Sequence, residues 1–121
     1  MLMEREGEMP NNLVVHYLYR DASNYKRHGS VIVANDAGIE PDALRDAIKA
    51  AFSHLDIFPD VVAFDPSALG WPSLFFEDHD PAGDDVGYHE LGIIEKTHEK
   101  PTVSRSASEL LFLLYKNDAN H

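Results

Sequence analysis

The sequence predicts a small α+β domain, in which an antiparallel sheet of three or four strands carries two helices packed mainly on one face. The 121 residues are enough for one modest core. Runs rich in β-branched and aromatic residues predict strands, and an amphipathic pattern between them predicts a helix. We expect one domain over residues 13–117, with a flexible N-terminal tail at 1–12 and a C-terminal tail at 118–121.

Residues 13–20, LVVHYLYR, predict the first strand. Both of its faces are largely apolar, which favours a central or well-covered position, and His16 is then expected to be a hydrogen-bonded core histidine. Residues 30–34 predict the second strand of a hairpin, joined to the first by a long polar loop at 21–29. That loop contains the densest basic cluster in the chain, made of Lys26, Arg27 and His28.

A helix of about four turns is expected to begin near Pro41, because proline suits the first turn of a helix. Its apolar positions recur at the spacing of one helix face: Leu44, Ala47, Ile48, Ala51, Phe52 and Leu55. Residues 61–64 predict a short strand, and Trp71 is expected to anchor the loop at 69–72 to the core.

Residues 86–96 predict a further strand, and the Ser106 and Glu109 pair has the spacing of a capping box at the start of a helix through about Asn117. The run LLFLLY at 110–115 is apolar on every side, so a buried strand is the alternative. In a helix, Phe112 and Leu113 would point away from the core face. This favours a homodimer formed through the C-terminal apolar segment.

Charge narrows the classes of function. The formal net charge is −11, and no Lys or Arg occurs between Ala50 and Glu95. Such a chain is not expected to bind nucleic acid or anionic membranes directly, but it favours cations and cationic partners. The absence of cysteine, of a signal peptide and of a membrane span indicates a cytoplasmic protein.

The acidic stretch at 77–90 concentrates six carboxylates and two histidines in fourteen residues. Its candidate binding residues are Asp78, His79, Asp80, His89 and Glu90. The stretch lacks the ligand spacing of a calcium loop and the HExxH pattern of zinc enzymes, so no cofactor is expected. A divalent metal held by His79, His89 and Asp80 is the alternative, and no motif indicates catalytic residues.

Three segments carry a resemblance: YRDASNYK at 19–26, DHD at 78–80 and YHE at 88–90. Together with the LGWP loop at 69–72, they resemble a group of small uncharacterised bacterial proteins with no known activity. The resemblance implies that the hairpin loop and the acidic stretch belong to one site or one charged network. Arg20, Asp21, Tyr25 and Lys26 then join the candidate binding residues, and Arg20 and Lys26 are expected to pair with Asp78, Asp80 or Glu90.

These observations favour a non-enzymatic binding or regulatory protein that recognises an unidentified protein partner through its acidic surface. One alternative is a metal-binding protein or small metal-dependent hydrolase that uses His79 and His89 with nearby carboxylates. Another is a phage-related inhibitor that mimics nucleic acid through its negative charge.

Overall fold

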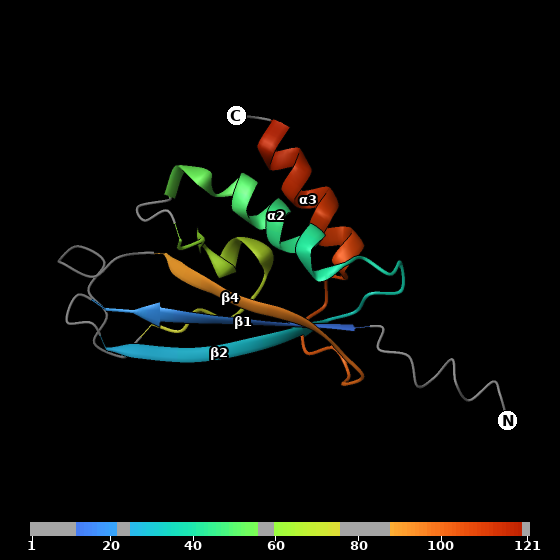
Figure 1. Ribbon diagram of the computed structural model, residues 1–121, viewed down its shortest axis with the longest axis horizontal. Coiled ribbons are helices and arrows are strands. Elements are labelled where there is room, and N and C mark those ends of the chain that lie inside the picture. Colours follow the sequence, from blue (N-terminus) through green and yellow to red (C-terminus); the bar gives the residue numbers. More distant parts are fainter. Residues whose placement is uncertain (1–11, 22–24, 56–59, 76–87, 120–121) are drawn as a thin grey trace, which may run out of the picture.

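The computed structural model describes residues 12–21, 25–55, 60–75 and 88–119. Its strands form one four-stranded antiparallel sheet in the order β2-β1-β4-β3. They are β1 (Asn12–Arg20), β2 (Lys26–Val33), β3 (Ala63–Phe64) and β4 (His89–Thr97). Helices α2 (Pro41–Ala51) and α3 (Ala107–Ala119) lie on the same face of the sheet (Figure 1). The predicted α+β fold class is confirmed.

The first hairpin is more regular than the sequence predicts. β1 and β2 pair without interruption from Leu13 opposite Val33 to Arg20 opposite Lys26. Residues 26–29, expected in a loop, therefore belong to the strand. Their polar side chains suit this place because β2 is an edge strand, where charges are tolerated and pairing comes from the backbone.

The central position of β1 is confirmed, but the prediction for His16 is wrong. Successive side chains of a strand alternate between the two faces of the sheet. Leu13, Val15, Tyr17 and Tyr19 are buried on the helix side. His16 points to the opposite face, which we call the outer face, and is exposed there because both helices lie on the other side.

Helix α2 follows the predicted amphipathic pattern, with Leu44, Ala47, Ile48 and Ala51 buried. It ends at Ala51, one turn earlier than expected, and a 3₁₀ turn at Ser53–Leu55 follows. The short strand predicted at 61–64 is present as β3 (Ala63–Phe64), and a second 3₁₀ turn, Pro66–Leu69, leads to Trp71. Trp71 is buried and packs against the rings of Tyr17 and Phe64, as the predicted anchor.

The segment 110–115 is helical, so the strand alternative is wrong. Helix α3 begins with the predicted capping box: Ser106 N donates to Glu109 Oε1 at 2.8 Å, and Glu109 N donates to Ser106 Oγ at 3.2 Å. Ala107, Leu110 and Leu114 are buried, and Phe112 is 74% exposed as expected. Leu113 differs from the expectation because it packs partly against the core. Dimerisation through this helix stays a prediction.

The connection from β4 to α3 crosses to the far edge of the sheet. Thr102 N donates to Ile32 O, and Ile32 N donates to Thr102 Oγ1, so the connection is tied to β2. Ala107 N then donates to Ala34 O at the start of α3. Residues 86–87 of the predicted last strand lie outside the described residues. No helix in the described part of the chain is long and apolar enough to cross a membrane.

Candidate functional site

An ion pair joins the end of the first hairpin to the last residue of the acidic stretch. Arg20 Nε donates to Glu90 Oε2 at 2.8 Å, and Arg20 Nη2 donates to Glu90 Oε1 at 3.3 Å. The hydrogen bond to Glu90 raises the pKa of the Arg20 guanidinium. Burial, followed by the charge of Glu90, raises the pKa of the neighbouring Tyr88 hydroxyl. The predicted pairing of Arg20 with Glu90 is confirmed.

Asp21 and Tyr25 close the turn between β1 and β2. Asp21 N donates to Tyr25 O at 3.0 Å, and Tyr25 N donates to Asp21 Oδ1 at 2.9 Å. The carboxylate of Asp21 therefore stabilises the turn. The Tyr25 side chain is 69% exposed, and Lys26 is exposed opposite Arg20, so both are accessible to a partner.

His89 lies in the core. It is 1% exposed, and its Nε2 accepts a hydrogen bond from Leu74 N at 2.9 Å. The rings of Tyr19 and Phe75 lie 5.1 Å from its own. Because Nε2 is the acceptor, this nitrogen carries no proton, and the imidazole holds the segment after Trp71 against the sheet.

Asp78, His79 and Asp80 lie outside the described residues, and so does most of the acidic stretch. Within the ranges that the structure describes, no group of three or more histidine or carboxylate side chains is placed to hold a metal ion. Of the alternative metal set, only His89 can be located, and its Nε2 is engaged with the backbone.

The outer face of the sheet contains a hollow of about 400 Å³ that the sequence did not indicate. We call it the outer-face hollow. Leu18 and Ile93 contribute apolar surface, and His16, His28 and Glu95 contribute polar groups. His16 Nε2 lies 3.4 Å from a carboxylate oxygen of Glu95, and both side chains are about half exposed. The remaining lining residues are Tyr17, Gly29 and Gly92.

A β-bulge in β4 exposes Ile93. Between the pairs Val15–Ile94 and Tyr17–Leu91, β4 has one residue more than β1. Gly92 occupies this irregularity, where an added Cβ would lie 3.0 Å from the carbonyl oxygen of His16. Such a bulge turns the following side chain away from the regular alternation. Ile93 is accordingly 67% exposed.

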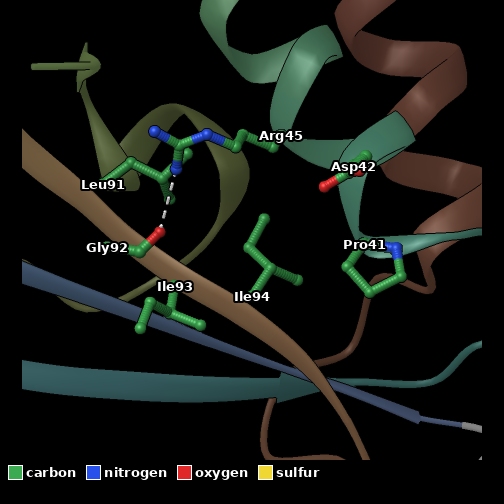
Figure 2. A pocket seen from close by; sticks show the side chains of 7 residues that line it. All are labelled: Pro41, Asp42, Arg45, Leu91, Gly92, Ile93 and Ile94. Carbon is green, nitrogen blue, oxygen red and sulfur yellow. Dashed lines mark hydrogen bonds between the residues drawn. The ribbon is translucent and has the colours of Figure 1, made fainter. Parts of the chain in front are cut away.

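A second hollow, of about 420 Å³, lies between β4 and the first turns of α2. We call it the edge groove. Pro41, Asp42 and Arg45 of α2 face Leu91, Gly92, Ile93 and Ile94 of β4 (Figure 2). Arg45 Nη1 donates to Gly92 O at 3.1 Å and closes one end of the groove. Gly92 and Ile93 line both hollows, so Ile93 lies where the two meet.

No family model, curated protein or solved structure matches this chain.

Three of the candidate binding residues predicted from the sequence lie on the same face as the outer-face hollow. Residues directly opposite each other in a sheet lie on the same face. Arg20 lies opposite Lys26, Leu18 opposite His28, and Leu18 also opposite Glu90. By strand alternation Arg20, Lys26 and Glu90 therefore lie on the outer face with the outer-face hollow. These three charged residues thus border an apolar surface, an arrangement suited to binding a polypeptide.

One signal in the sequence, which the sequence analysis did not use, could have indicated this surface. Gly92 interrupts a strand pattern and is followed by two isoleucines, and a glycine inside a strand often marks a bulge. The exposure of Ile93 could not be inferred from this, because it depends on the register between β1 and β4.

Proposed function

We propose that this chain is a non-enzymatic binding protein that recognises a basic segment of another protein on the outer face of its sheet. The outer-face hollow carries this proposal. Both helices lie on the opposite face, so Leu18 and Ile93 form an apolar centre beside the charged residues Arg20, Lys26 and Glu90. Exposed apolar surface rimmed by polar groups is typical of sites for protein partners.

Charge supports a basic partner. The net charge of −11 favours association with cationic polypeptides and increases the rate of encounter. On the outer face, the Arg20 guanidinium is already engaged by Glu90, while the carboxylate of Glu95 is exposed. The lack of cysteine supports a cytoplasmic location as part of this proposal.

A selection experiment tests the proposal. The full chain, immobilised, is used to select from a display library of random dodecapeptides, and the enriched peptides are synthesised and titrated by calorimetry. We expect enrichment of basic peptides whose binding weakens with added salt. Leu18→Ala and Ile93→Ala should each weaken binding about tenfold, as removal of a central apolar contact does.

Phe112→Ala and Tyr115→Ala are the matched controls, because they remove exposed aromatic rings from α3, on the other side of the molecule. Their binding should stay within about twofold of the parent protein. The proposal would be refuted if the α3 variants weakened peptide binding and the outer-face variants did not. A selection that enriches no peptide would also refute it.

The alternatives have distinct outcomes in the same preparation. A metal site would appear as stoichiometric metal in untagged protein, lost in His89→Ala. Mimicry of nucleic acid would appear as competition with DNA for the selected basic peptides, lost at high salt. Either result would replace peptide binding as the favoured function.

A further inference from the structure

The outer side of β4 has a stretch of backbone with no neighbouring strand among the described residues. β3 pairs with β4 only at His89 and Glu90, and Leu91 N donates to Val62 O just beyond. From Gly92 to Thr97, β1 lies on one side of β4 and no described strand lies on the other. Backbone groups in such an edge can hydrogen-bond to an added strand.

We propose that a basic, extended segment of the partner adds to this edge as a fifth strand beside β4. The inference rests on the proposed function and specifies its binding mode. Successive side chains of an added strand would point to opposite faces of the sheet. The edge groove lies beside this edge, whereas the outer-face hollow extends from β4 across β1 to β2, and the two share Gly92 and Ile93. One set of side chains would enter the edge groove, and the other set would lie beside Ile93 and Glu95, at the border of the outer-face hollow.

The opposite edge of the sheet is not suited to this role. β2 presents Lys26, Arg27 and His28 at its exposed end, and these charged or polar side chains discourage pairing. At its other end, Ile32 already exchanges hydrogen bonds with Thr102. The exposed stretch of β4 instead presents Ile93, which a strand lying alongside would cover.

Charge on the two sides of the edge specifies a basic strand. Asp42 lines the edge groove and Glu95 the outer-face hollow, and both are exposed. Glu95 lies 3.4 Å from His16 Nε2, and two cations of β4 and α2 are engaged elsewhere: Lys96 pairs with Glu40 at 3.4 Å, and Arg45 binds Gly92 O. Two neighbouring Lys or Arg residues of the added strand, pointing to opposite faces, could therefore each meet one carboxylate.

Backbone methylation of a selected dodecapeptide tests the inference. Two versions carry N-methyl groups at alternate residues, one at odd positions and one at even positions. Only alternate N–H groups of an added strand point toward its neighbour. We expect one version to lose binding by at least about tenfold and the other to bind within about threefold of the parent peptide, because each missing bond to a neighbour is costly.

The protein side has a matched pair of variants. Ile93→Lys places a cation on the β4 edge and should weaken binding by at least about tenfold, whereas Phe112→Lys places one on α3, on the other side of the molecule, and should not. Circular dichroism and thermal unfolding confirm that both variants are folded. Equal binding of the two methylated peptides, with binding still reduced in Leu18→Ala, would overturn strand addition and leave the proposed function standing. Failure to select any peptide would overturn both.

Discussion

At the scale of single residues, Tyr17 links the central strand to the segment that carries Trp71. Its hydroxyl donates to Pro72 O at 2.6 Å, and its ring meets Phe64 edge-on at a centroid distance of 5.6 Å. Burial raises the pKa of Tyr17 to about 12. Since an unfolded chain would ionise this hydroxyl near pH 10, the fold favours the neutral form.

We therefore expect an alkaline loss of stability that depends on Tyr17. The contribution is complete below pH 10 and falls as the pH rises from 10 to 12, because only the unfolded state readily releases the proton in that range. Each tenfold change in proton affinity is worth about 1.4 kcal/mol, so the loss reaches roughly 2 to 3 kcal/mol near pH 12. Urea unfolding at pH 8, 10 and 11 measures it.

Tyr17→Phe is the comparison. It should cost about 1 kcal/mol at pH 8, because the carbonyl of Pro72 loses its donor, and should then lose less stability than the parent protein above pH 10. Parallel losses in the two proteins would show that other groups account for the alkaline effect.

The Arg20–Glu90 pair is expected to contribute little stability in spite of its good geometry. Its side chains are 36% and 19% exposed, so solvent screens the attraction. A double-mutant cycle with Arg20→Met and Glu90→Gln should give a coupling free energy of about 0.5 to 1 kcal/mol in urea unfolding. The more exposed Lys96–Glu40 pair, at 3.4 Å, serves as the control and should give a value near zero. Equal coupling free energies in the two pairs would contradict the expectation that the less exposed pair interacts more strongly.

The sequence predicted some of these residue-level features and missed others. The pairing of Arg20 with Glu90 could be predicted because the resemblance placed the hairpin loop and the acidic stretch in one charged network. The exposure of His16 could not be predicted, because an apolar pattern on both faces of a strand does not reveal which face the helices leave open. The burial of His89 among aromatic rings likewise depends on contacts far apart in the chain.

At the scale of elements, the start of α3 depends on its capping box. Ser106→Ala or Glu109→Ala should each reduce the free energy of unfolding by about 0.5 to 2 kcal/mol, because each leaves a backbone N–H at the helix start without its partner. Thermal unfolding followed by circular dichroism measures this loss. Ser106→Asp retains an acceptor and should restore most of it. A full loss in the aspartate variant would point to a packing role for the Ser106 side chain.

Elements with a strong local signal were predictable, and their ends were less so. The spacing of Leu44, Ala47, Ile48 and Ala51 predicted α2, and the Ser106 and Glu109 pair predicted α3. The start of β2 was missed because Lys26 and its neighbours are polar, and their strand conformation comes from pairing with β1. Pairing between strands is a tertiary effect that local sequence preferences do not include.

At the scale of the whole molecule, strand order decides where the candidate site lies. The sequence predicted an antiparallel sheet with helices on one face, but it did not give the order β2-β1-β4-β3. In this order β4 lies between β1 and β3, on the side of β1 away from β2. Because β3 has only two residues, much of the β4 edge has no described neighbour. The edge groove therefore depends on a short element whose length no composition rule supplies.

The order of the strands also has a consequence for synthesis on the ribosome. The central strand, β1, is made first, and its neighbour β4 follows about seventy residues later in the chain. Until β4 has emerged from the ribosome, the side of β1 that pairs with β4 is open, and Tyr17 lacks its cross-strand partner Leu91. The connection that ties Thr102 to Ile32 is made later still. The sheet is therefore completed from the C-terminal quarter of the chain, and a nascent chain that stops short of it holds an open central strand.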